Sequence, residues 1–566
     1  MTRRACLAVC AAMLLVAAAA PLAAQRHATV PVDAPVYRLL ESAEMRGIIS
    51  RLPRAKPYSE RRIAGYLEAI WADRGALSAA EREVLAEYRG RYSAEPDVPV
   101  SFSVTGGAEG RADLAAVEDA HFFSTIGAEA MGDIGRSFSY KAGFLYHLQR
   151  INGNAWAPFD FTKQWDGIRI GVENFEHDRE IDEVNDFVSL SHSIRPDAAV
   201  SLFDGNAEIR WAKVRRSWGH GEGSLELSAQ ARPADGISIF ASPAEWVYFD
   251  YLTASLGDWT TAEPDENPDT PSDHKMLTIH QVELYPFDWL SLSVFESVIW
   301  GKRFELSYLN PLSVYIVSQH QIGDIDNLLP GAATKVRLAP WGNWYASVFV
   351  DSIRHDDFAG IFDNVINMFA YQSGIKVNLP WLPFATATLQ YTKIEPYMYT
   401  HYPQEYSFFD RPVDSSYTHD GENLGFHLPP NSDEIFLGVT TLPRPGLRLG
   451  VSYQLIRHGD NPDAPDPGED ADDRQIEGDI DDYLVYRDRE KYPDKDFLND
   501  GIYEWVNIAS VRGDYRLPDT GFSLWSEYSF SYALNWLNER DNTMVRNALG
   551  LGFEYSYDFS LRGGGD

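Results

Sequence analysis

The chain changes its hydrophobic period near Pro99. Between Ala34 and about Tyr92, apolar residues recur with a period of about 3.6, which is typical of amphipathic helices. Beyond Pro99, apolar and polar residues alternate with a period of two, which is typical of strands with one apolar face. The pattern therefore predicts a small N-terminal helical module followed by a long all-β region.

The helical module contains three predicted helices. Ser78 and Glu81 have the spacing of a capping box, which marks the start of the third helix. Amphipathic stripes of this kind are far more often packing surfaces than functional grooves, so we expect the helices to pack on one another. The predicted bounds are Val36 to Met45, from after Pro57 to before Gly75, and Ser78 to Gly90.

The strands of the all-β region are long and numerous. Between Leu549 and Phe559, apolar and aromatic residues alternate with small or polar ones, and the same alternation recurs in the segments from Phe138, Leu447 and Phe522. This template predicts roughly 16 to 20 strands of about eight to twelve residues. An open sheet rarely accommodates so many strands.

Two architectures fit these strands: soluble β-sandwiches and a transmembrane antiparallel β-barrel. Sandwich strands are usually five or six residues long, whereas about ten residues span a bilayer in a tilted strand. Tyr and Phe also gather at strand ends, as in Tyr555 to Phe559 and Tyr528 to Tyr532, where an aromatic girdle would meet the lipid headgroups. Strand length and ring position favour the barrel, with its polar face lining a lumen.

The first 24 residues have the pattern of a secretory signal peptide. Arg3 and Arg4 precede the apolar run from Leu7 to Ala20, and small residues follow at Ala23 and Ala24. An uncleaved anchor helix is the alternative, but the Ala-rich composition and the small-residue ending favour cleavage. No second apolar stretch of about 18 residues follows, so we expect no helical membrane span downstream.

Cysteine use limits the chemistry of the mature chain. Cys6 and Cys10 are its two cysteines, and both lie in the predicted signal peptide. The mature chain is then expected to lack a disulfide, a cysteine nucleophile and a thiolate metal site.

The expected organisation has three parts: a signal peptide at 1–24, a periplasmic helical module at 25–95, and an outer-membrane β-barrel with long external loops at 96–566. Two connections, Asp258 to His274 and Gly459 to Asp500, are long and acidic, and barrels carry their long loops on the external side. Clustered carboxylates could bind Ca²⁺, but the spacing lacks the EF-hand pattern, which favours solvated loops.

The net charge, the aromatic content and the missing catalytic motifs exclude several classes of protein. The chain has 49 basic and 83 acidic residues and a net charge of −34, which argues against a nucleic-acid-binding protein. Its 29 Phe, 30 Tyr and 15 Trp exclude a disordered chain. The sequence has no nucleophile elbow or His-Glu-x-x-His motif, and His401, His419 and His427 lack helix-face metal spacing, so no catalysis, metal or cofactor is expected.

A more specific pattern spans Glu296 to Asp351, with a second one at Trp218-Gly219 and the segment to Pro233. Together they resemble the Wzi-type capsule assembly proteins of Gram-negative outer membranes, although His220 stands where that family favours Pro. The residues that match the family motif are Trp218, Gly219, Glu296, Arg303, Asn310 and Pro311.

The resemblance implies an outer-membrane barrel of about 18 strands with a periplasmic helical bundle. It implies a non-enzymatic surface lectin that retains capsular or extracellular polysaccharide, and whose other partners are outer-membrane lipid and the barrel assembly machinery. The alternative is an outer-membrane porin or substrate-specific channel, because barrels of about 16 to 18 strands can leave an aqueous lumen. An outer-membrane hydrolase is the third hypothesis, and no motif favours it.

Candidate carbohydrate-binding residues follow from sugar chemistry, because a sugar ring has an apolar face and a fringe of hydroxyls. Exposed aromatic residues on external loops suit it, and Trp259, Tyr399 and Tyr402 fit that description. The motif residues are expected to be structural. Asn310-Pro311 has the sequence of a turn at a strand end, and Arg303 beside Glu296 and Glu305 is typical of a charge pair in the lumen.

Overall fold

The computed structural model describes most of the chain. The predicted signal peptide and most of both acidic connections lie outside the described residues. The described ranges are 27–92, 100–114, 120–135, 137–152, 168–170, 186–257, 275–301, 303–323, 325–352, 367–401, 415–419, 422–459, 497–498 and 502–560.

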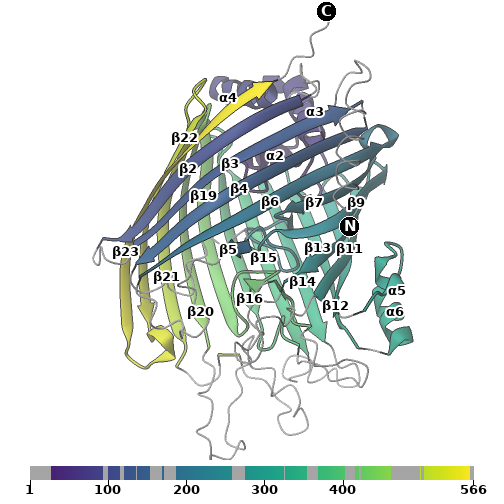
Figure 1. Ribbon diagram of the computed structural model, residues 1–566, viewed down its shortest axis with the longest axis vertical. Helices are drawn as coiled ribbons and strands as arrows, with labels where there is room; N and C mark the ends of the chain where they lie inside the picture. The colour runs from purple at the N-terminus through teal and green to yellow at the C-terminus, as the bar shows by residue number, and fades with distance from the viewer. Residues whose placement is uncertain are drawn as a thin grey trace, which may run out of the picture.

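Eighteen long antiparallel strands form a closed barrel, with the three-residue strand β5 added beside β6 (Figure 1). The barrel closes where β2 pairs with the last strand, β23, from Ser101 opposite Ser560 to Asp113 opposite Ala548. The strands are β2 (Val100–Asp113), β3 (Ala120–Ile134), β4 (Phe138–Asn152), β5 (Ile168–Ile170), β6 (Asp186–Leu202), β7 (Ala207–Val214), β9 (Ala234–Ala244), β10 (Val247–Leu256), β11 (Lys275–Phe287), β12 (Leu290–Gly301), β13 (Asn327–Leu338), β14 (Gly342–Ser352), β15 (Met368–Asn378), β16 (Thr386–Ile394), β19 (Ser432–Arg444), β20 (Leu447–His458), β21 (Glu504–Arg516), β22 (Phe522–Leu534) and β23 (Thr543–Ser560).

The alternating apolar and polar residues of the strands lie on opposite faces of the barrel wall. Leu551, Phe553 and Leu524 are about half exposed on the outer face, at 54, 48 and 45%. Their strand neighbours point inward, because successive side chains lie on opposite faces of a strand. The predicted transmembrane barrel is thus confirmed. Within the described part of the chain, no helix is long and apolar enough to cross a membrane.

The three predicted helices are present as α2 (Val36–Met45), α3 (Glu60–Ala72) and α4 (Ala79–Arg91). The predicted capping box also forms, because the Glu81 amide donates to Ser78 Oγ and the Ser78 amide donates to the Glu81 carboxylate. Two further helices, α5 (Leu306–Leu309) and α6 (Tyr315–Ile322), follow β12. Short 3₁₀ turns lie at Arg74–Ala76, Phe203–Gly205 and Trp536–Asn538.

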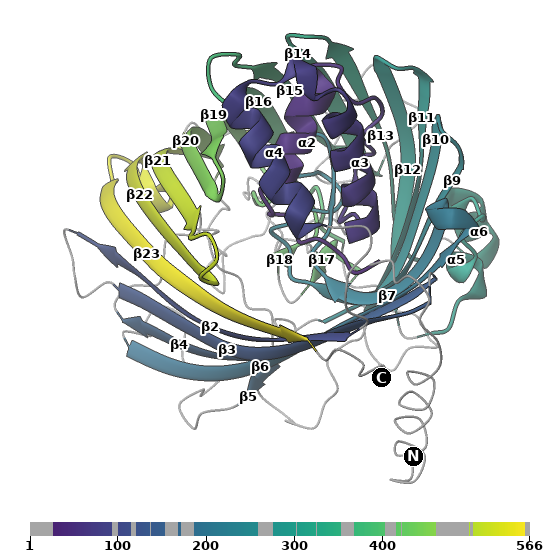
Figure 2. The same ribbon diagram turned by 90° about the horizontal axis from the view of Figure 1, so that it is seen from above.

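Helices α2, α3 and α4 lie inside the ring of strands at one end of the barrel, which we call the helical end (Figure 2). Their apolar stripes pack together around fully buried Leu39, Leu67 and Leu85. Phe384, from the turn between β15 and β16, and Leu442, near the end of β19, join the same cluster. The helices are therefore packed on one another and on the barrel turns, as amphipathic stripes predict.

The two ends of the barrel differ in the length of their connections. At the helical end, β9 and β10 are joined across Ala244 to Val247, and β11 and β12 across Phe287 to Leu290. At the opposite end, which we call the far end, β10 is followed by β11 only at Lys275, and β20 by β21 only at Glu504. The predicted long connections thus leave from strand ends that lie away from the helices.

The last strand offers a test of the two faces. Replacing Phe553 on the outer face with Arg should destabilise the barrel by about 2 to 4 kcal/mol, because a cation would enter the hydrocarbon. Replacing its neighbour Glu554 with Arg should cost much less. The free energy of unfolding of both variants in lipid vesicles measures the difference, and equal costs would contradict the assigned faces.

Candidate functional site

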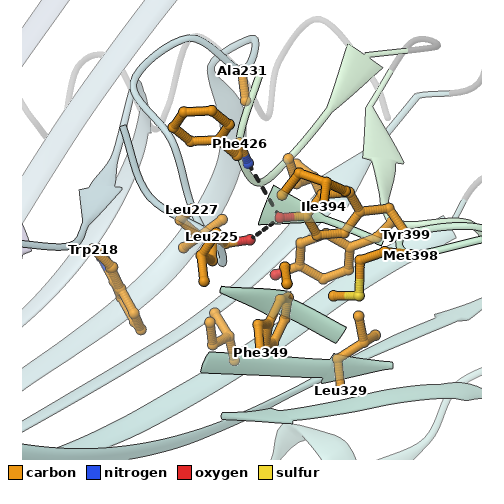
Figure 3. Close-up of a cluster of buried hydrophobic side chains, with 14 of the residues drawn as sticks. Trp218, Leu225, Leu227, Ala231, Leu329, Phe349, Ile394, Met398, Tyr399 and Phe426 are labelled. Carbon is orange, nitrogen blue, oxygen red and sulfur yellow. Dashed lines mark hydrogen bonds between the residues drawn. The ribbon is translucent and has the colours of Figure 1, made fainter. Parts of the chain in front are cut away.

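The chain between β7 and β9 leaves the wall and enters the lumen. Strand β8 (Ser217–Trp218) pairs there with β1 (Ala55–Lys56) of the N-terminal segment. The Trp218 carbonyl accepts hydrogen bonds from Arg54 Nη2 at 2.8 Å and Ser224 Oγ at 2.9 Å. Leu225 and Leu227 continue this excursion as buried side chains (Figure 3).

A second excursion enters the lumen between β16 and β19 and meets the first. It includes the short sheet of β17 (Thr418–His419) and β18 (Glu422–Asn423), which lies inside the ring in Figure 2. Tyr399 lies between Leu225 and Phe426 (Figure 3): its hydroxyl donates to the Leu225 carbonyl at 2.7 Å and accepts from the Phe426 amide. We call residues 215–233 and the described residues of 395–431 the lumen plug.

Aromatic packing holds the plug to the wall. Tyr399 and Tyr417 stack at 5.8 Å, and Phe349 of β14 packs against both rings. Burial raises the pKa of both tyrosines well above the usual range, so each stays a neutral donor. The cluster reaches the wall at Leu252, Leu277, Ile279, Phe295, Ile299, Leu329, Phe349, Met368, Ile394, Ile456, Val506 and Ala533.

A buried charged group joins the helical module, the plug and the wall. Arg54 and Glu226 are both 1% exposed and form an ion pair. The Arg54 guanidinium also donates to Gln281 at 3.2 Å, and its backbone amide donates to Glu283 at 2.9 Å. Arg54 lies 4.8 Å over the ring of Phe295. The segment before α3 is therefore fixed to the plug and to strands β11 and β12.

A second ionic network fixes α2. Arg38 donates to both carboxylate oxygens of Glu222 in the plug, at 2.6 and 2.5 Å. Lys376 on the inner face of β15 lies 3.1 Å from Glu41 and 3.4 Å from Glu222. Burial alone would raise the pKa of Glu222, but Arg38 and Lys376 outweigh it and lower that pKa to about 2. Charge pairing therefore keeps this carboxylate ionised.

His220, which departs from the expected Pro, lies in the same region. Burial lowers its pKa well below the usual range, and the nearby cations Lys335 and Arg54 lower it further. The ring is thus neutral at pH 7. Its Nε2 lies 3.9 Å from the Glu283 carboxylate.

The three predicted carbohydrate-binding residues are not brought together in the described structure. Trp259 and Tyr402 lie outside the described residues. The expectation that Tyr399 is an exposed ring on an external loop is wrong, because its side chain is fully buried in the plug. An aromatic residue between two strands has the same sequence pattern whether the chain turns outward or folds back into the lumen.

The motif residues lie at two sites. Trp218 and Gly219 belong to the plug, where a Cβ on Gly219 would lie 3.0 Å from Ser224 Cβ. Glu296, Arg303, Asn310 and Pro311 belong to, or contact, the helical excursion after β12. All six residues have contacts within the protein.

Two expectations for these residues are wrong in detail. Arg303 does not pair with Glu296 in the lumen, because Glu296 lies on the outer face of β12. The other expected neighbour, Glu305, does lie 3.7 Å from Arg303, which also makes a bidentate ion pair with Asp326. Asn310-Pro311 forms a turn, with Asn310 Oδ1 accepting from the Leu312 amide at 3.1 Å. This turn lies between α5 and α6 rather than at a strand end.

The three histidines have separate partners. His419 Nδ1 accepts from the Gly257 amide at 2.9 Å, and His427 Nε2 lies 3.2 Å from Glu434. The His401 amide donates to Ser416 Oγ. Among the residues that the structure describes, no group of three or more His, Cys, Asp or Glu side chains is arranged to hold a metal ion.

A family model for the capsule assembly protein Wzi matches residues 193–487, which is more than half of the chain. The chain belongs to the Wzi capsule assembly protein family. The matched range contains the whole plug and the helical excursion after β12. Membership and fold together make the protein an outer-membrane β-barrel.

Three of the solved structures that resemble this chain differ in how well they match it. Wzi of Escherichia coli, described as an outer-membrane protein involved in group 1 capsule assembly and a carbohydrate-binding β-barrel, is 14% identical, with 94% of this chain and all of that chain covered and a TM-score of 0.56. OprD of Pseudomonas aeruginosa is 11% identical, with 82% and 95% covered and a TM-score of 0.40. OccAB2 of Acinetobacter baumannii is 10% identical, with 82% and 98% covered and a TM-score of 0.42. No curated protein matches the chain.

The α2 network predicts a pH dependence. Because the pKa of Glu222 is lowered by folding, its stabilisation is complete above the unfolded value of about 4.3 and is lost as the pH falls toward about 2. The difference is on the order of 3 kcal/mol. Hydrogen exchange of Val36–Met45, corrected for intrinsic rates, should therefore accelerate over this range, while Leu447–His458 serves as the internal control.

The variant Glu222→Gln distinguishes the loss of the Glu222 charge from the other effects of low pH. It should expose α2 to exchange already at pH 7, and exchange should then change much less between pH 4.3 and 2. Glu41, whose pKa is also held well below the usual range by Lys376 and Lys56 against the effect of burial, should leave a residual dependence. Unchanged protection of wild-type α2 at pH 2 would contradict the role of the network.

Proposed function

We propose that this protein retains capsular or extracellular polysaccharide at the cell surface as a non-enzymatic outer-membrane lectin. Membership of the Wzi capsule assembly family carries the proposal. The description of Escherichia coli Wzi as a carbohydrate-binding β-barrel supports it, because that protein covers nearly the whole of this chain. Polysaccharide is then the main partner, and the barrel assembly machinery is needed only for insertion.

The filled lumen supports binding over transport. A porin needs a continuous aqueous path. Here the plug joins inner-face residues from β10 to β16 in one buried cluster and extends to Ile456, Val506 and Ala533 on β20, β21 and β22. This packing obstructs the lumen along that part of the wall, which is unfavourable for a wide channel.

The lengths of the connections support one orientation of the barrel. Outer-membrane barrels have short periplasmic turns and longer external loops. The helical end with its short turns is then periplasmic, so the module at 25–95 lies in the periplasm and the loops of the far end are surface-exposed. Polysaccharide would meet the far end first.

Trp259 and Tyr402 remain the proposed sugar-stacking residues, because both belong to far-end connections. Tyr399 has a different role in this proposal, since its ring and hydroxyl hold the plug. Ring stacking adds contact area on an apolar sugar face without changing the strands.

A retention assay tests the function. In a deletion strain, polysaccharide should move from the cell surface into the medium, and the wild-type gene should restore retention. Normal retention combined with impaired solute uptake or altered single-channel conductance would favour the porin alternative instead. Measuring cell-bound and released polysaccharide in the same culture decides between the two outcomes.

Point variants locate the contact. Trp259→Ala should weaken polysaccharide binding by roughly fivefold to tenfold, since a stacked ring contributes on the order of 1 kcal/mol. Removing residues 460–496 should also release polysaccharide while the barrel still shows heat-modifiable migration in detergent gels. Trp381→Ala is the matched control, because Trp381 is 73% exposed on a helical-end turn. Equal losses for Trp259→Ala and Trp381→Ala would contradict a far-end site.

A further inference from the structure

The segment between β12 and β13 forms a helical hairpin on the outside of the barrel. It spans residues 303–323 and includes α5 and α6, which lie beyond the outer face of the wall in both views (Figures 1 and 2). A barrel wall in a bilayer faces acyl chains at this position. The hairpin therefore lies between a part of the outer face of the wall and the medium around the barrel.

Polar side chains on the outer wall bind the inner side of the hairpin. Glu296 of β12 accepts from the backbone amides of Tyr315 and Ile316, at 2.8 and 3.2 Å. His280 of β11 pairs in register with Glu296, and its ring nitrogens lie 3.0 Å from the Glu296 carboxylate and 3.2 Å from the Pro311 carbonyl. Both side chains are largely covered, at 13 and 15% exposed.

The same pattern continues at the end of α5. The Tyr251 hydroxyl of β10 donates to the Leu309 carbonyl at 3.2 Å. Backbone groups at the end of α5 and the start of α6 have no partner within their own short helices. Wall side chains satisfy several of them, which is the requirement for irregular backbone at membrane depth.

An aromatic layer seals the contact between hairpin and wall. Tyr315 stacks on His280 at 4.3 Å, and Tyr308 contacts both Tyr315 and Trp300 at 5.9 Å. Tyr308 and Tyr315 are fully buried. The Tyr308 hydroxyl donates to Asp326, which also pairs with Arg303, so the base of the hairpin is fixed as well.

The opposite side of the hairpin is exposed and carries mainly apolar residues, beside exposed Asn310, His320 and Gln321. It adjoins the outer face of β12, where Val294 is 63% exposed. An exposed side that carries mainly large apolar residues is the reverse of what a water-facing hairpin would show. The exposed apolar residues are Phe304 (74%), Leu306 (68%), Leu312 (80%), Val314 (54%), Ile316 (45%) and Val317 (54%).

We propose that this hairpin is embedded in the membrane and that lipid acyl chains cover its apolar side. The continuity with the lipid-facing wall and the satisfied backbone groups both support lipid as the occupant. The hairpin follows the far end of β12, so the lipids are those of the outer leaflet in the orientation proposed above. Glu296 and His280 are then polar residues on the lipid side of the barrel that the hairpin shields.

Depth-dependent quenching tests the proposal. In a full-length Cys6→Ala and Cys10→Ala background, Leu312→Cys and Val317→Cys are labelled with bimane and reconstituted in phosphatidylcholine vesicles with or without brominated acyl chains. Both labels should lose emission in the brominated vesicles to the same extent as Val294→Cys on the outer wall. Ala69→Cys, on an exposed position of α3, should keep its emission.

Two results would overturn the proposal. Emission at Leu312→Cys and Val317→Cys that matches Ala69→Cys would place the hairpin in water. Unquenched labels, together with disulfide crosslinks between copies when the same cysteines are left unlabelled, would identify a second copy of the chain as the occupant. Glu296→Ala provides an independent readout, since it should loosen the hairpin and reduce quenching at position 317, whereas Glu296→Gln, which keeps an acceptor oxygen, should retain most of it.

Discussion

The interior of the barrel depends on the ion pair and hydrogen bonds of the buried Arg54 guanidinium. A charge in the interior is costly unless it is paired and hydrogen-bonded, and removal of one partner of such a pair typically costs about 3 to 5 kcal/mol. Arg54 meets this requirement only by contacting the plug through Glu226 and Trp218 and the wall through Gln281. Helical module, plug and wall are therefore positioned together, and none of the three can shift alone without leaving a charge unpaired.

The requirement that a buried charge be paired and hydrogen-bonded also applies to charged side chains on both faces of the wall. Inside, Lys376 is paired with carboxylates of α2 and the plug, so the lumen side of β15 serves as an attachment surface. Outside, Glu296 lies on a face that otherwise carries apolar residues, and the backbone amides of α6 satisfy its carboxylate. At Glu296, the departure from the alternation of apolar and polar residues thus coincides with a segment that leaves the wall and packs back onto it.

Much of the architecture could be predicted because strand and helix periods are local properties of the sequence. Helix α2 was expected at Val36 to Met45 and is found there, and β23 contains the whole alternating segment from Leu549 to Phe559. The interior could not be predicted in this way. Arg54 and Glu226 are 172 residues apart, and nothing in either local sequence identifies the partner.

The errors have the same origin. Tyr399 was expected on an exposed loop because loops carry no periodicity that distinguishes an outward from an inward course. Arg303 was assigned to the lumen although Glu296, its supposed partner, has the strand parity of the lipid-facing Val294. Counting strand parity from Val294 would have placed Glu296 outside, so this signal was present in the sequence. The partner of Arg303, Asp326, lies beyond α6 and could be found only from the fold.

The pairing of β2 with β23 gives the molecule a definite order of maturation. The N-terminal helices are synthesised first, yet their ionic partners Lys335 and Lys376 follow about half a chain length later, and the ring that surrounds them exists only after the final strand has paired. Contacts so distant in sequence form late and slowly. A truncation that removes only β23 would therefore leave the ring open at β2, far along the chain from the helices it encloses.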